Sequence, residues 1–207
     1  MYNSNVAILR ITTDAEFLRK KSKPVTEFNA RLHQLLDDMR DTLEDAWGLG
    51  LAAVQVGVLY RVCLVRCEKS SPPNGGVDAH GAQTANGVVE LINPEIIACS
   101  SEKPGEEGCL SVPDAGYHTV IRPHKVTVRA QDRNGKTFTR DFEKISAVCA
   151  CHEIDHMDGI LFTDKSSGFA RPKAAKRKQS SPSQGEGVAS RKRSASAQAE
   201  SDDGVGI

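Results

Sequence analysis

The sequence predicts an α+β domain in which antiparallel or mixed β-sheets pack around a C-terminal helix, with an amphipathic helix near the N terminus. Three observations predict this class. Apolar residues recur at helical spacing over 27–46, they alternate with polar residues over 125–143, and a short apolar helix is expected over 145–157. The 207 residues, 39% hydrophobic and 26% charged, suit one ordinary globular domain with some additional chain.

The composition excludes several classes of protein. No window approaches eighteen consecutive apolar residues, so no membrane span and no membrane partner are expected. No signal peptide is visible, because Asp14 and Glu16 interrupt the first apolar run. In such a chain the six cysteines are expected to be reduced thiols, one of them a metal ligand, rather than three disulfides. We therefore expect a cytoplasmic protein.

The first half of the chain predicts one helix and two strands. Leu32, Leu36 and Met39 follow the helical repeat over 27–46, and Thr26 is the expected N-cap. A glycine-punctuated loop, WGLGLAAVQVG, then leads into an apolar strand over 61–65. Residues 68–89 are rich in Gly, Ser, Pro and Asn and predict a long surface loop before a strand over 91–97.

The second half predicts a hairpin followed by a helix. Residues 125–143 alternate in polarity around a tight turn at Asn134-Gly135, with Phe138 and Phe142 on one face of the return strand. The helix over 145–157 is short and largely buried, and Gly159 stands where its C-terminal cap is expected.

The last forty residues differ in composition from the rest. They are low-complexity Lys, Arg, Ser, Ala and Gln with no aromatic residue after Phe169, so they cannot bury enough apolar surface to fold. The predicted organisation is a folded domain over 1–168 and a basic, disordered tail over 169–207. Between Arg171 and Arg193 the tail carries eight basic residues against one acid, Glu186.

The helix over 145–157 carries His-Glu-x-x-His, at His152, Glu153 and His156. Side chains four residues apart leave the same face of a helix, so both imidazoles can reach one ion at about 2.1 Å. Glu153 can then face the open position of that ion. A surface helix with chance charged residues is the alternative, but the apolar flanks favour a metal site.

A catalytic metal needs a third protein ligand, and the sequence restricts where it can come from. Phe162 occupies the position of a third histidine in one metallopeptidase pattern, and the only downstream glutamates lie in the tail. Cys149 lies seven residues before His156, about 10.5 Å along a helix, which is too far for one ion.

The remaining cysteines are therefore compared by their local sequence. Cys151 points about 100° from His152 and, like Cys149, is expected to pack in the helix. Cys63 and Cys99 belong to predicted strands and are expected to be buried. Cys109 lies in GEEGCLSVP, where Gly108 allows the backbone close to a ligand, and is the best candidate.

With these three ligands the sequence resembles the peptide deformylase family. Three motifs carry the resemblance, in the order of the family: GLGLAAVQ at 48–55, EGCLS at 107–111 and HEIDH at 152–156. The resemblance spans Val6 to Lys165. The departures are Val54 in place of a usual proline, Cys151 in place of glutamine, the longer 68–89 loop, and Asp114 to Tyr117 where an arginine is often found.

The resemblance implies a reaction and a set of roles. The enzyme would be a metal-dependent hydrolase that removes the formyl group from the formylmethionine of nascent polypeptides. The family generally uses Fe(II), with Zn(II) or Ni(II) as alternatives on a thiolate site. Glu153 would be the general base, and the Gln55 amide and the Leu110 backbone N–H would stabilise the oxyanion.

Other residues near these motifs receive weaker assignments. We expect Val148 and Cys149 to line the pocket for the methionine side chain, with plain core packing as the alternative, and Gly50 to approach the substrate backbone. Glu107 and Ser111 are interpreted as structural supports of the Cys109 turn. Asp155 either orients a ligand histidine or caps a loop.

Two other functions and two uses of the tail remain open. A metallopeptidase that cleaves internal peptide bonds would need the missing downstream ligand. A non-catalytic, ribosome-associated metal-binding module would not need Glu153 or Gln55. The basic tail is either a solvated segment without a defined partner or an electrostatic contact to ribosomal RNA.

Overall fold

In the computed structural model, residues 7–67, 76–77, 83–85 and 87–166 are described, and all belong to one compact unit, Met1–Arg171. The predicted domain boundary and tail lie outside the described residues. The α-helices are α1 (Ala15–Leu18), α2 (Ala30–Asp45) and α3 (Ile145–Met157), and the 3₁₀ helices are η1 (Ala53–Val56), η2 (Pro113–Ala115) and η3 (Phe162–Asp164). The strands are β1 (Gly50–Ala52), β2 (Val62–Arg66), β3 (Gly76–Val77), β4 (Gln83–Ala85), β5 (Val88–Cys99), β6 (Glu102–Glu107), β7 (His118–Pro123), β8 (Lys125–Gln131) and β9 (Thr137–Glu143).

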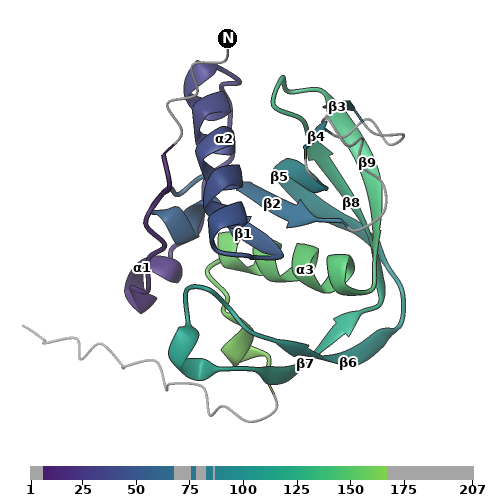
Figure 1. Cartoon of the computed structure of the whole chain (residues 1–207). Helices are drawn as coiled ribbons and strands as arrows, with labels where there is room; N and C mark the ends of the chain where they lie inside the picture. The colour runs from purple at the N-terminus through teal and green to yellow at the C-terminus, as the bar shows by residue number, and fades with distance from the viewer. Residues whose placement is uncertain (1–6, 68–75, 78–82, 86, 167–207) are drawn as a thin grey trace, which may run out of the picture. The chain divides into compact units, whose positions relative to one another are not determined.

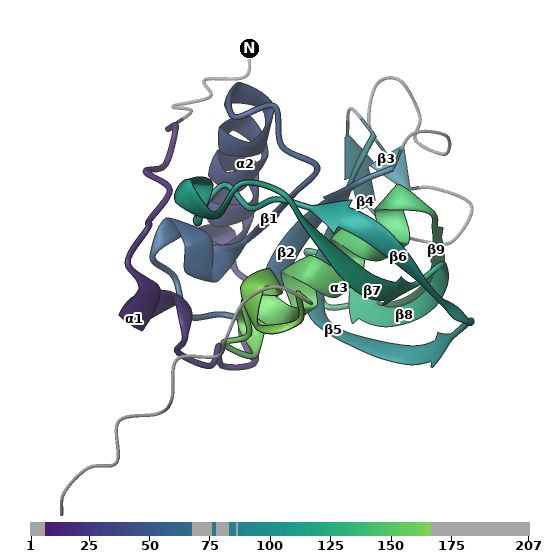
Figure 2. The same cartoon turned by 90° about the horizontal axis from the view of Figure 1, so that it is seen from below.

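The strands form two antiparallel sheets, which confirms the predicted α+β class. In the larger sheet β2 pairs with β1 and β5, β5 also pairs with β4 and β8, and β8 pairs with β9. In the smaller sheet β6 pairs with β7. Figures 1 and 2 show α3 between the larger sheet and the β6–β7 ribbon, with α2 on the other side of the larger sheet.

The central strand β2 separates two apolar cores. Val62 and Leu64 face the core that α2 completes with Leu36. Cys63 and Val65 face the core that α3 completes. Because side chains alternate between the faces of a strand, a strand covered on both faces is apolar throughout, as the predicted strand over 61–65 is.

The helix α2 confirms the predicted amphipathic helix but begins later than expected. Leu32, Leu36, Met39 and Leu43 are buried on one face. The predicted N-cap at Thr26 is wrong, because Asn29 takes this role and its Oδ1 accepts hydrogen bonds from the backbone N–H groups of residues 31 and 32, at 3.0 and 3.2 Å. Asparagine is among the preferred N-cap residues.

The predicted 68–89 loop needs correction where the structure describes it. Strands β3 and β4 form a small antiparallel pair within this segment, and β5 begins at Val88 rather than at residue 91. The remainder of the segment lies outside the described residues. Strand β5 has bulges near Pro94, and its second half, which pairs with β8 alone, is largely exposed.

The predicted hairpin is confirmed, and it leads directly into α3. Phe138 and Phe142 are both buried on one face of β9, opposite Ala130 and Val126 of β8. The turn takes in Arg133 as well as Asn134-Gly135, with Gly135 at φ +83°. A three-residue turn of this kind ends in a left-handed residue, for which glycine has no steric penalty.

The helix α3 has the predicted limits and ends in a Schellman motif. The N–H of Gly159 donates to the carbonyl of His156 at 3.1 Å, and the N–H of Ile160 donates to the carbonyl of Asp155 at 2.9 Å. Gly159 has φ +74°, and a Cβ there would lie 2.4 Å from the carbonyl oxygen of Arg19. Within the described residues, no helix has the length and apolarity to cross a bilayer.

Candidate metal centre

The helix α3 presents His152 and His156 on the face turned towards the β6–β7 segment. The two imidazole centroids lie 4.8 Å apart, with the rings inclined at 74°. Both side chains are buried, as is Glu153 between them in the sequence. Three buried ionisable groups within five residues of one short helix are costly unless they have partners or a function.

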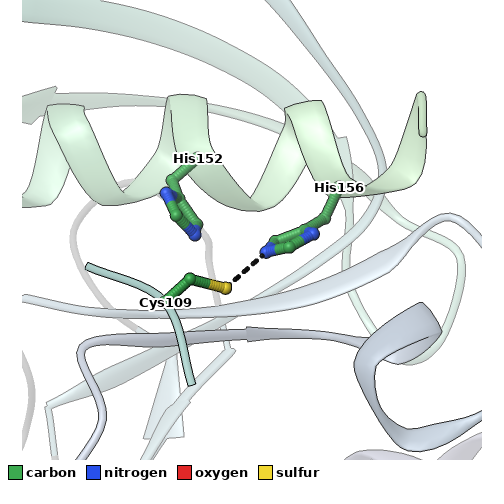
Figure 3. Close-up of side chains that lie close together, drawn as sticks. All are labelled: Cys109, His152 and His156. Atoms are coloured by element: carbon green, nitrogen blue, oxygen red, sulfur yellow. Dashed lines mark hydrogen bonds between the residues drawn. The ribbon is translucent and has the colours of Figure 1, made fainter. Parts of the chain in front are cut away.

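Cys109 reaches these histidines from the segment that follows β6, 43 residues or more earlier in the chain. Its Sγ lies 3.2 Å from Nε2 of His156, and Figure 3 shows the thiol pointing towards both rings. One donor atom each from Cys109, His152 and His156 lies within 4.8 Å of the others. Within the described part of the chain, no other group of three such side chains converges in this way.

The donor set fits one divalent ion of intermediate softness. On a tetrahedral ion with bonds of about 2.1 and 2.3 Å, a nitrogen and a sulfur ligand lie about 3.6 Å apart. The observed 3.2 Å between Cys109 and His156 needs only a small adjustment to reach that value. One thiolate and two imidazoles leave a fourth position for water, which is typical of a catalytic rather than a structural site.

Glu107 and Arg122 orient His152, one of the three candidate ligands, and this role was missed in the sequence. Nδ1 of His152 lies 2.9 Å from Oε2 of Glu107, which leaves Nε2 as the nitrogen that could coordinate an ion. Arg122, buried in β7, donates to both carboxylate oxygens of Glu107 at 2.7 and 3.0 Å. Glu107 was interpreted only as a support for the Cys109 turn, and Arg122 lies outside the three motifs.

The charge of Glu107 is maintained although the side chain is buried. Burial raises the pKa of Glu107, but the hydrogen bonds from His152 and Arg122 and the charge of Arg122 outweigh it and bring the pKa down to about 2. The carboxylate is therefore ionised near neutral pH. An ionised acceptor keeps the proton of His152 on Nδ1, the tautomer that metal binding through Nε2 requires.

Asp155 belongs to the same network, and its carboxylate forms no hydrogen bond with His152 or His156. Its carboxylate accepts from Arg122 at 2.5 Å and from Lys165 at 2.8 Å. The sequence left two roles open for Asp155, orienting a histidine or capping a loop. Asp155 can orient His152 only indirectly, through Arg122 and Glu107. Arg122 joins Glu107, two residues before Cys109, to Asp155, one residue before His156.

The environment of Glu153 suits a group that exchanges protons. Burial raises the pKa of Glu153 to about 7, against the opposing charge of His152. Its Oε2 makes no hydrogen bond within the described residues. Burial also lowers the pKa of His156 to about 3, so this imidazole is neutral and able to coordinate.

Gln55 is oriented by its own turn. The backbone N–H of Ala52 donates to Oε1 of Gln55 at 2.8 Å, so the amide nitrogen points the other way. Nε2 lies 3.3 Å from Oγ of Ser111 and 3.8 Å from Sγ of Cys109. The side chain thus presents an N–H group at the edge of the metal centre.

A cavity of about 430 Å³ opens on this centre. Its lining includes the sequence-predicted residues Gly50, Gln55, Leu110, Val148 and Cys149. A Cβ on Gly50 would lie 2.5 Å from both Sγ of Cys149 and Oε1 of Glu153, so any side chain there would displace the glutamate.

The other cysteines lie outside the metal centre. Cys149 and Cys151 are buried in the core around α3, and burial raises the pKa of both thiols. Cys63 is buried as expected. The expectation for Cys99 is wrong, because this residue is exposed at the end of β5. That end of the strand pairs with β8 alone, which leaves one edge open to solvent.

Comparisons with known sequences agree with the motifs. The family described as polypeptide deformylase matches residues 8–172, a range that contains every residue of the cavity. A peptide deformylase of Caldicellulosiruptor bescii is 44% identical over 176 residues, which cover 84% of this chain and 95% of that protein. A peptide deformylase of Heliobacterium modesticaldum is 46% identical over 148 residues, which cover 72% of this chain and 86% of that protein.

Solved structures show the same fold. The crystal structure of a peptide deformylase from Legionella pneumophila has a TM-score of 0.66 and 41% identity, covering 79% of this chain and 87% of that one. The actinonin-bound structure of a class I type b peptide deformylase from Acinetobacter baumannii has a TM-score of 0.65 and 31% identity, covering 78% and 99%.

Proposed function

Since the chain belongs to the polypeptide deformylase family, and so is a hydrolase that removes the N-formyl group of newly synthesised proteins, we propose that Cys109, His152 and His156 hold the divalent cation of this reaction. The observation that carries the proposal is the convergence of three donor atoms within 4.8 Å from two distant segments. The ionised Glu107 beside His152 supports it, since metal-bound histidines commonly donate to a carboxylate.

Glu153 is the general base in this proposal. A bound divalent ion supplies Lewis acidity to the formyl carbonyl and lowers the pKa of a water molecule. Glu153 takes the proton of the attacking water and returns it to the leaving amine. A pKa near 7 suits both transfers, and the unpartnered Oε2 leaves the carboxylate available for them.

Two groups near Cys109 can donate to the developing oxyanion. We assign the Gln55 amide, whose direction is set by the Ala52 N–H, and the Leu110 backbone N–H, which makes no backbone hydrogen bond within the described residues. Val148 and Cys149 line the cavity and are assigned to the methionine side chain, while Gly50 leaves room for the substrate backbone.

The metal is proposed to be Fe(II), with Zn(II) and Ni(II) as alternatives. One thiolate with two imidazoles accepts all three ions, so the donor set alone does not select among them. A thiolate site that holds ferrous iron is sensitive to oxidation. The protein should therefore be prepared without oxygen.

Formate release from formyl-Met-Ala tests the reaction and the ligand set together. The intact protein, reconstituted with Fe(II) without oxygen, should release formate and bind one metal ion per chain. Cys109→Ala should lose both activity and metal. Absence of formate release by the fully metallated protein would contradict the catalytic assignment, and full metal binding by Cys109→Ala would contradict the third ligand.

Alkylation provides a second test that does not depend on activity. Removing the metal with a chelator should make Cys109 reactive towards iodoacetamide, because its thiol is only half-buried. Exposed Cys99 should react with or without metal, and buried Cys63 and Cys149 should react in neither state. Peptide mass spectrometry measures each site, and equal labelling of Cys109 in both states would contradict its role as ligand.

The partner of the enzyme is the nascent formylated polypeptide. We further propose that the enzyme is cytoplasmic and that it contacts the ribosome through the basic segment 171–193. Support comes from the sequence alone, since these residues lie outside the described part of the chain. Deletion of 171–207, or replacement of its eight basic residues by glutamine, should weaken co-sedimentation with ribosomes. Added salt should likewise weaken the co-sedimentation of the intact protein. Unchanged co-sedimentation would favour a tail without a partner.

A further inference from the structure

Trp47 stands at the mouth of the cavity in a conformation that favours glycine. The helix α2 ends in a Schellman motif, in which the N–H of Trp47 donates to the carbonyl of Glu44 and the N–H of Gly48 to that of Leu43, both at 3.1 Å. Trp47 has φ +52° in this motif, whereas Gly159 occupies the same place at the end of α3. A side chain in the left-handed region costs about 1–2 kcal/mol.

Trp47 contributes little to the stability of the fold. Its side chain is 94% exposed, so it adds almost nothing to either core. A strained backbone and an exposed indole both reduce stability or solubility, and such positions are typical of binding sites.

The exposed apolar residues of the cavity mouth come from both of its sides. Trp47 and Leu49 lie before β1, Ile145 begins α3, and Tyr117, which is 77% exposed, precedes β7. The ring of Tyr117 lies against Gly108, where a Cβ would come within 2.9 Å of it. This places the tyrosine one residue from the ligand Cys109 and makes the patch continuous with the metal centre.

The charged side chains that line the cavity indicate which kind of ligand group the aromatic rings would bind. The described cavity lining contains no lysine or arginine, and its three carboxylates are Glu106, Glu107 and Glu153. Glu107 is paired with Arg122, and Glu153 is buried. Glu106 is exposed, accepts a hydrogen bond from Oγ1 of Thr119 at 2.9 Å, and forms no ion pair with any described residue.

We propose that Trp47, Tyr117 and Glu106 bind a cationic side chain in the residues directly after the formylmethionine of the nascent chain. Aromatic faces attract lysine and arginine, and the carboxylate of Glu106 adds an opposite charge. The segment 114–117, DAGY, supplies the tyrosine of this site and no positive charge. The proposal rests on the assignment of the cavity as the substrate site.

The test compares formyl-Met-Ala-Lys, formyl-Met-Ala-Glu and formyl-Met-Ala-norleucine by kcat/KM. The intact enzyme should prefer the lysyl peptide, mainly through KM. Trp47→Ala and Glu106→Gln should each lower the lysyl-to-glutamyl ratio by about 3- to 10-fold. Trp47→Phe should retain most of the preference, and added salt should remove the part that depends on Glu106.

Matched controls separate this role from general effects on folding. Tyr60→Ala removes an exposed aromatic outside the cavity, and Glu102→Gln removes an exposed carboxylate from the same strand as Glu106; both should leave the ratio unchanged. Trp47→Gly should lower the ratio while its melting temperature stays equal or rises, because glycine accepts the left-handed conformation.

The two proposals fail in different ways. If all variants release formate and the ratio does not change in Trp47→Ala or Glu106→Gln, the cation site is wrong and the catalytic assignment stands. If the intact enzyme releases no formate from any of the three peptides, the cavity is not the substrate site and both proposals are overturned.

Discussion

The helices α2 and α3 pack against opposite faces of one sheet but bury different chemistry. Helix α2 buries an apolar stripe, including Leu36 and Met39, and leaves its charged residues in solvent. Helix α3 is buried on most sides and carries His152, Glu153 and His156 into the protein. Buried apolar groups stabilise a fold, whereas buried ionisable groups cost free energy unless they are paired. We therefore expect substitutions in α2 to change stability and those in α3 to change activity.

Glu153→Gln should have the largest effect and tests the α3 side of the comparison. Loss of a general base lowers rate by about 10²- to 10⁴-fold. The variant should still bind one metal ion, since the ligands are intact, and its free energy of unfolding should not fall, because a buried charge is replaced by a neutral group. Steady-state formate release, metal analysis and urea unfolding measure the three quantities. A large loss of stability would contradict the separation of roles.

Leu36→Ala tests the α2 side. Leu36 is fully buried, so its truncation should lower the free energy of unfolding by about 2–5 kcal/mol. The activity of the molecules that remain folded should be close to that of the intact enzyme, because Leu36 does not line the cavity. Arg31→Ala, exposed on the same helix, is the control and should change stability by no more than about 0.5 kcal/mol. A comparable loss of unfolding free energy in both variants would contradict the view that α2 stabilises the protein through its apolar core.

Arg122→Lys sharpens the comparison by changing how the metal ligands are held. Lysine keeps the charge but cannot donate to Glu107 at two points while also contacting Asp155. The affinity for the metal should fall by about 10- to 100-fold. Competition with a chelator measures it, and Arg129→Lys, in an exposed pair with Glu95, is the matched control. Equal affinity in Arg122→Lys would show that the network serves stability alone.

Asn29→Ala should have the smallest effect and tests the corrected start of α2. Loss of the two N-cap hydrogen bonds should lower the free energy of unfolding by about 1 kcal/mol. Thr26→Ala should have almost no effect, because Thr26 does not cap the helix. Thermal unfolding measures both variants. The reverse order of effects would restore Thr26 as the cap.

Much of the fold and the metal centre could be predicted because the signals are local. The helical repeat over 27–46, the alternation over 125–143 and the HEIDH spacing each lie within one segment, and the limits of α3 were predicted to the residue. Comparison of the six cysteines then left Cys109 as the best candidate for the third ligand, and the structure brings its thiol to within 3.2 Å of His156.

Features that depend on contacts between distant segments could not be predicted. Arg122 lies in an ordinary strand sequence, and only the pairing of β7 with β6 brings it to Glu107. Strands β3 and β4 have a loop-like composition, and they become strands because the sheet provides partners for their backbone groups. The exposure of Cys99 likewise follows from the edge of β5 on which it lies.

The sequence by itself determined which side chains could carry the chemistry, since two histidines and a glutamate on one helical face need no other part of the chain to be aligned. Only the tertiary structure decided how those side chains are held and what surrounds them. The thiol of Cys109, the Glu107–Arg122–Asp155 network and the Trp47–Tyr117 mouth all join segments from different parts of the chain. Their positions depend on long-range packing, which a local pattern does not encode.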